Sequence, residues 1–101
     1  MNKNKILMDI IQEIIECATE EIQKIDAGKS SKWSIVQLES IVIPEMSELL
    51  EFANGGEVLL KYGRKQRLLE STYTMTDSIQ NLDNTQLGIK ISKLQKVYNS
   101  I

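Results

Sequence analysis

The sequence predicts an all-α fold, an antiparallel bundle of about four helices. Apolar residues recur at steps of three and four through long stretches, as they do on one face of an α-helix. One proline and five glycines among 101 residues are too few for the many turns of an all-β fold. Hydrophobic residues make up 42% and charged residues 26%, as in folded globular proteins. Because 101 residues are too few for two cores, we expect residues 1–101 to form a single domain.

The first helix is predicted from Lys3 to Ala27. Its apolar residues share one wide face of the helix: Ile6, Leu7, Ile10, Ile11, Ile14, Ile15, Ala18, Ile22 and Ile25. Gly28 follows, and glycine readily adopts the left-handed backbone conformation with which many helices end. We therefore place the end of this helix at Gly28, with a polar connection over residues 29–32.

The second helix is predicted to begin after Ser34, a typical N-cap residue, and to end at residues 54–56, Asn-Gly-Gly. Pro44 lies inside it. Proline lacks an amide donor and clashes with the carbonyl four residues earlier, so the helix either kinks at Pro44 or a new helix begins there. The apolar positions keep one helical register on both sides of the proline: Ile35, Leu38, Val42, Met46, Leu49 and Ala53. We therefore favour one kinked helix.

Residues 57–81 allow two interpretations. A helix is indicated by a 3.6-residue spacing and by a middle part rich in Lys, Arg, Gln, Leu and Glu. A β-hairpin over residues 57–75 is the alternative, because two short apolar runs flank a turn that begins at Gly63. We favour the helix because of the spacing. Local irregularity is expected at residues 71–74, Ser-Thr-Tyr-Thr, whose helix propensity is poor.

The last helix is predicted to begin after Thr85, which can cap it. Its apolar residues share one face: Leu87, Ile91, Leu94, Val97, Tyr98 and Ile101. Gly88 in the first turn indicates close packing against another segment. Before this helix, residues 72–78 are rich in hydroxyl groups. We expect them to serve the structure, with Asp77 as a helix N-cap or buried hydrogen-bond acceptor, rather than to form a polar binding surface.

The composition excludes several kinds of active site. The sequence has no histidine and one cysteine. The usual zinc sites, Ser-His-Asp catalysis and Cys-His catalysis therefore cannot be assembled from one chain. Neither a glycine-rich phosphate-binding motif nor an EF-hand loop is present. We predict no enzyme activity, no cofactor and no metal site.

The sequence predicts a cytoplasmic protein. No uncharged run reaches the roughly 18 residues that a membrane-spanning helix requires. Charged and polar residues such as Asp9, Gln12 and Glu13 interrupt the apolar N-terminal stretch, unlike a signal peptide. Cys17 has no second cysteine with which to form an intrachain disulfide, which favours a reducing compartment. We expect its thiol to be buried and unreactive.

Acidic residues form the first candidate partner-binding group. Four carboxylates, spaced by three or four residues, form a stripe along the first helix: Asp9, Glu13, Glu16 and Glu20. The stripe can receive a basic partner or a hard cation, and the alternative is an ordinary solvated helix face, which we favour. Glu45, Glu48 and Glu51 form a shorter acidic group to which the same alternatives apply.

A basic cluster and one tryptophan complete the candidate partner-binding residues. The cluster consists of Lys61, Arg64, Lys65 and Arg67. These side chains either contact phosphates or, as we favour, form ion pairs or face solvent. Trp33 lies beside a basic loop and is either an interface residue or a residue at the edge of the core, and we favour the core.

These observations favour a small, non-catalytic protein that binds another protein or a second copy of itself as a homodimer. Acidic first and second helices suit a basic partner, which such a protein would neutralise or regulate. Bacterial immunity proteins and antitoxins offer an analogy in size, charge and fold class only. The alternative is a nucleic-acid-associated accessory protein that uses the basic cluster. The net charge of −2 disfavours nucleic acid and an anionic membrane as partners.

Overall fold

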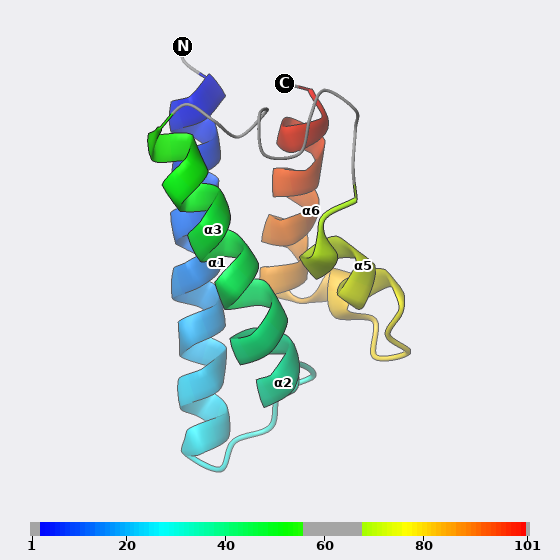
Figure 1. Cartoon of the computed structure of the whole chain (residues 1–101). Helices are drawn as coiled ribbons and strands as arrows, with labels where there is room; N and C mark the ends of the chain where they lie inside the picture. Colours follow the sequence, from blue (N-terminus) through cyan, green and yellow to red (C-terminus); the bar gives the residue numbers. More distant parts are fainter. Residues whose placement is uncertain (1–2, 56–67, 101) are drawn as a thin grey trace.

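Helices dominate the structure, a computed structural model that describes residues 3–55 and 68–100 (Figure 1). Within these ranges no β-strand is present, and the expected all-α bundle is confirmed. Helix α1 (Lys3–Asp26) packs against α3 (Ile43–Asn54) and α6 (Gln86–Asn99), which both run opposite to α1. We call these three the helix frame. The short helix α5 (Glu70–Thr76) packs against α6 at the side of the frame. No helix in the described ranges combines the length and apolarity needed to cross a membrane.

Helix α1 ends where its sequence predicts. Gly28 adopts a φ of 80°, in the left-handed region. Its amide donates to the carbonyl of Ile25 at 3.0 Å, and the amide of Lys29 donates to the carbonyl of Lys24 at 2.8 Å. These two bonds form the Schellman arrangement, in which a glycine at the left-handed position avoids strain. The predicted helix boundary at Gly28 is therefore confirmed.

The chain stays helical through Pro44. Three segments follow one another without a break: α2 (Ile35–Gln37), the π-helix η1 (Leu38–Val42) and α3. The amide of Ile43 donates to a carbonyl five residues earlier, which is the wide turn of a π-helix. This π-turn accommodates the proline, which lacks a donor and would clash within a regular α-helical turn. The helical path continues through Pro44 as expected, but it changes to a π-helix in η1, and Pro44 lies in the first turn of α3, as in the alternative.

Two helix starts use the caps that the sequence predicts. The Ser34 hydroxyl accepts a hydrogen bond from the amide of Gln37 at 3.1 Å. In return, the side-chain oxygen of Gln37 accepts one from the amide of Ser34 at 2.8 Å, which completes a capping box. At the start of α6, the Thr85 hydroxyl accepts from the amide of Gly88 at 3.0 Å. Both caps are local, so three or four residues of sequence are enough to predict them.

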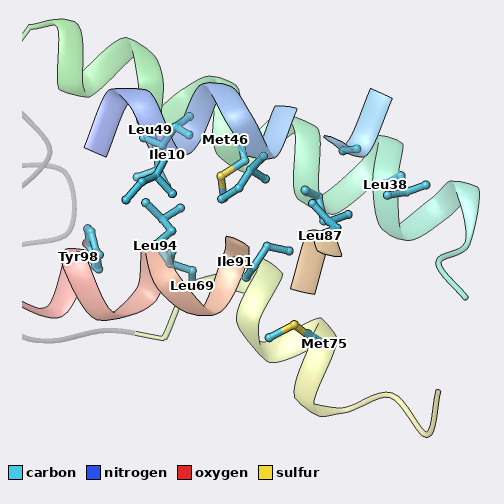
Figure 2. Close-up of a cluster of buried hydrophobic side chains, with 14 of the residues drawn as sticks. Ile10, Leu38, Met46, Leu49, Leu69, Met75, Leu87, Ile91, Leu94 and Tyr98 are labelled. Carbon is cyan, nitrogen blue, oxygen red and sulfur yellow. The ribbon is translucent and has the colours of Figure 1, made fainter. Parts of the chain in front are cut away.

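The core lies among the three helices of the helix frame, and α5 covers one side of it. Figure 2 shows buried apolar side chains from all four helices converging there. Its largest fully buried members are Leu7, Ile11, Ile14, Leu38, Met46, Leu49, Leu69, Leu82, Leu87, Ile91 and Leu94. Full burial of one such side chain contributes about 1.5–3 kcal/mol, so this cluster is the main source of stability.

The predicted helix over residues 57–81 is wrong in its bounds. Residues 56–67 lie outside the described ranges, but Leu69 has an extended backbone (φ −67°, ψ 149°) and α5 covers only seven residues. A helix that continues through Leu69 is therefore excluded. The hairpin alternative over 57–75 also disagrees with the structure, because residues 70–76 are helical. Tertiary contacts of the backbone at Leu69, described below, override the 3.6-residue spacing.

Close packing at Gly88 is confirmed. The 3₁₀-helix η2 (Leu82–Asn84) lies directly against the first turn of α6. A Cβ atom added to Gly88 would overlap the carbonyl oxygen of Leu82 and come within 2.8 Å of the Cα of Asp83. The obstacle is main chain rather than a flexible side chain, so only glycine fits at this position.

Candidate functional site

A groove opens between the π-turn and α5. It has a volume of about 320 Å³ and is lined by Ile41 of η1 together with Leu68, Glu70, Tyr73 and Thr74. Leu68 is 52% exposed and Tyr73 is 61% exposed, beside the partly buried Ile41. Apolar side chains that gather at a concave surface with a polar rim mark interaction sites. We call this feature the α5 groove.

Three carboxylates lie next to the α5 groove. A second hollow of about 140 Å³ shares Ile41 and Glu70 with the groove, and Glu45 and Glu48 also line it. Glu48 and Glu70 are exposed, whereas Glu45 is buried. The apolar groove therefore continues into an acidic end, formed by Glu45, Glu48 and Glu70. Such an arrangement suits a ligand that has apolar and cationic groups side by side.

Glu45 holds the start of α5. Its Oε2 accepts a hydrogen bond from the amide of Glu70 at 2.7 Å, and its Oε1 accepts one from the amide of Ser71 at 2.8 Å. The N-cap residue, Leu69, has no polar side chain with which to cap the helix. A carboxylate from α3 therefore caps α5, and its negative charge suits the positive end of the helix dipole. The interpretation of Glu45 as part of a solvated acidic face is wrong.

Gln95 of α6 also forms hydrogen bonds with the first turn of α5 and the residue before it. This side chain is 8% exposed. Its Oε1 accepts hydrogen bonds from the amide of Leu69 at 2.9 Å and from the hydroxyl of Thr72 at 2.8 Å. The structural role expected for the hydroxyl-rich stretch is correct for Thr72. It is wrong for Asp77, which is exposed and follows the C-terminal end of α5.

The segments that build the α5 groove carry acidic charge only. Residues 34–55 and 68–85 contain no lysine or arginine. Their carboxylates are Glu39, Glu45, Glu48, Glu51, Glu70, Asp77 and Asp83. These two segments therefore carry a net negative charge, although the net charge of the whole chain is only −2; Arg67, which precedes Leu68, lies outside the described residues. Such local charge attracts cationic groups and accelerates their association.

The predicted acidic stripe lies on the solvent face of α1. Its members are all exposed: Asp9, Glu13, Glu16 and Glu20. Glu13 forms an ion pair with Lys90 of α6, at 3.1 Å between Oε1 and Nζ. None of the four lines the α5 groove. Within the described ranges, no three His, Cys, Asp or Glu side chains gather in a way that could hold a metal ion.

Trp33 belongs to the core. Its side chain is 3% exposed, and its indole Nε1 donates a hydrogen bond to the hydroxyl of Thr85 at 3.0 Å. A buried tryptophan usually finds such a partner for its one donor. Here the bond joins the loop before α2 to the cap of α6. The preferred interpretation of Trp33 as a core residue is therefore confirmed.

The basic cluster of Lys61, Arg64, Lys65 and Arg67 lies outside the described residues. The phosphate-binding and ion-pairing interpretations of these four residues therefore both stay predictions. Charge reversal at Arg64 and Lys65 tests the first, because salt-sensitive binding to nucleic acid would then be lost.

Cys17 is partly buried. Burial raises the pKa of its thiol, and the charges of Glu21 and Glu20 raise it further. Because the thiolate is the reactive form, a raised pKa lowers the reactivity of this side chain near neutral pH. The environment of Cys17 is therefore that of a structural cysteine.

Two residues that line the α5 groove, Tyr73 and Thr74, belong to the hydroxyl-rich stretch for which a polar binding surface is the less favoured sequence interpretation, whereas Ile41 and Leu68 are not among the candidate residues. Tyr73 fits the spacing of the predicted long helix, in which Leu69 rather than Leu68 shares its face, and Ile41 is not among the apolar residues that define the face of the second helix. Comparisons of the chain with protein families, curated proteins and solved structures give no match. Function is therefore inferred from the residues of this chain alone.

Proposed function

We propose that the protein is a small, non-catalytic interaction module that binds a partner protein through the α5 groove. One observation carries this proposal: the exposure of Leu68 and Tyr73 beside Ile41 in a concave surface. Tyrosine is enriched at interfaces because its ring supplies apolar area and its hydroxyl a polar contact. Aromatic side chains at the centre of a small apolar surface carry much of the binding energy in known complexes.

The chemistry near the groove supports binding rather than catalysis. The sequence has no histidine to transfer protons near neutral pH. Glu45, the buried carboxylate beside the groove, is held by two backbone amides. The groove volume of about 320 Å³ is at the lower limit of the roughly 300–1,000 Å³ typical of small-molecule sites. A surface contact with a protein suits these dimensions better than an enclosed substrate.

Site-specific photo-crosslinking tests this proposal. A photoreactive phenylalanine analogue replaces Tyr73 in one variant and Ile79 in the matched control, each expressed in cells that naturally make the protein. Ile79 is 92% exposed and apolar, but it does not line the α5 groove. We expect a discrete crosslinked protein from position 73 and none from position 79. Equal crosslinking from both positions, or none from position 73, would refute the proposal.

A second copy of the chain is one of the partners that this experiment detects. In that case the crosslinked product has twice the mass of the chain, and peptide sequencing of the product contains this sequence only. Light scattering of the wild-type protein then gives a mass that falls toward that of one chain on dilution. In the Tyr73→Ala variant the same measurement gives the mass of one chain at all concentrations.

A further inference from the structure

We infer that the partner of the α5 groove presents a cationic amphipathic helix to it; this inference rests on the proposed function. The first argument is charge. The segments that form the groove, residues 34–55 and 68–85, contain carboxylates but no lysine or arginine. The exposed Glu70 lines both the apolar groove and its acidic end. When an apolar side chain of the partner enters the groove, the neighbouring residues of the partner come close to these carboxylates. Lysine or arginine is therefore favoured at those positions of the partner.

The second argument is the shape of the elements on either side. The groove lies between η1 and α5, two helical segments, and Ile41 lines it from one side and Tyr73 from the other. The described part of the chain has no strand edge to which an extended peptide could add a further strand. A helix satisfies its own backbone groups and presents anchors at positions i and i+4, about 5–6 Å apart. The described elements therefore favour recognition of a helix in the groove over addition of a β-strand.

A second copy of this chain is the competing occupant. Ile89 on α6 is 59% exposed, and Lys93 and Lys96 follow it at steps of four and three residues on the same face. If this face of one copy entered the α5 groove of another, the contact would join two different surfaces. Contacts of that kind form rings or open filaments rather than closed dimers. Growth of the mass with concentration in light scattering, abolished by Ile89→Ser, would identify this occupant and overturn the inference of a separate partner.

Three peptides of about 18 residues test the inference directly. The first is a helix of leucine and lysine with all leucines on one face. The second replaces every lysine by glutamate, and the third has the composition of the first in an order that destroys the apolar face. Fluorescence anisotropy of each labelled peptide, titrated with the full-length protein, measures Kd. We expect binding of the first peptide only, with an affinity that falls as salt is added. Equal binding of the second or third peptide would overturn the inference.

Variants of the protein show whether binding occurs in the α5 groove. Tyr73→Ala should raise Kd by about tenfold or more, as removal of an aromatic anchor does. Glu70→Gln should raise Kd by about threefold and weaken the salt dependence, whereas the control Ile79→Ala should change Kd by less than about twofold. Because all three side chains are exposed, the variants should fold, which circular dichroism confirms. A Kd that is unchanged by Tyr73→Ala would place the peptide elsewhere and overturn the inference.

Failure of this inference is distinguishable from failure of the proposed function. If position 73 crosslinks to a partner whose contacting segment is acidic or not helical, the function stands and the inference is wrong. If position 73 crosslinks to nothing, the function itself is refuted, whatever the peptides do. Mass spectrometry of the crosslinked segment makes this distinction, because it identifies the residues that lie in the α5 groove.

Discussion

Replacing Glu45 by alanine removes the side-chain acceptor of the first two amides of α5. These amides, of Glu70 and Ser71, donate to the carboxylate at 2.7 and 2.8 Å. Glu45 is 9% exposed, so water replaces the lost carboxylate only in part. The variant therefore leaves a helix end with unsatisfied donors beside a cavity.

The expected cost follows from these contacts. Hydrogen bonds to a charged group contribute about 1.5–3 kcal/mol, and loss of a helix cap costs about 0.5–2 kcal/mol. Because one carboxylate serves both amides, we expect Glu45→Ala to lower the free energy of unfolding by about 2–4 kcal/mol. For a domain of this size the melting temperature then falls by more than about 8 °C. Glu45→Gln keeps the shape, but its NH₂ group cannot accept, so it should restore only part of this loss.

Urea denaturation followed by circular dichroism measures these changes. Glu51→Ala is the matched control, because Glu51 is an exposed carboxylate on the same helix and should change stability by less than about 0.5 kcal/mol. Hydrogen exchange should show the largest loss of protection at the amides of Glu70 and Ser71. If Glu45→Ala and Glu51→Ala have equal stability, Glu45 does not hold α5 and the reasoning fails.

Three further predictions concern single buried positions. Gly88→Ala should lower the free energy of unfolding, measured by urea denaturation, by about 1–3 kcal/mol or more, because the added Cβ atom overlaps main-chain atoms. The control Ile89→Ala, at an exposed neighbouring residue, should lower it by less than about 1 kcal/mol. Ser71→Ala should leave stability unchanged or raise it by up to about 1 kcal/mol, since the buried hydroxyl has no hydrogen-bond partner among the described residues. Thr72→Val should cost about 1 kcal/mol through loss of the bond to Gln95. Cys17 should react with iodoacetamide more slowly than free cysteine at pH 7, because burial raises the pKa of its thiol. The reaction rate should still rise as the pH passes 9. A reaction as fast as that of free cysteine at pH 7 would contradict the effect of burial.

Elements with local signals were predictable from the sequence. The ends of α1, α2 and α6 depend on Gly28, Ser34 and Thr85, whose partners lie within about five residues. The helical path through Pro44 was predictable because the apolar register continues on both sides of the proline. The form of the irregularity, a π-turn, was not predictable, because a kink and a π-turn use the same apolar positions.

The start of α5 could not be predicted because its determinants are remote. Glu45 and Gln95 are 25 and 26 residues away from the amides that they bind. In the sequence, Glu45 cannot be distinguished from its neighbours Glu48 and Glu51, which share a pattern typical of a solvated face. The α5 groove was missed for the same reason, because its walls meet only when α5 begins at Glu70.

The dependence of α5 on side chains from other helices has a thermodynamic consequence. A seven-residue helix is too short to be stable alone, so α5 is ordered only while Glu45 and Gln95 hold it. Local opening that releases these contacts therefore dismantles one wall of the groove while the helix frame persists. A ligand of the groove binds only the closed state, and it stabilises α5 by RT ln(1 + [L]/Kd). Exchange of the α5 amides therefore measures occupancy of the groove through the local opening, without unfolding of the helix frame.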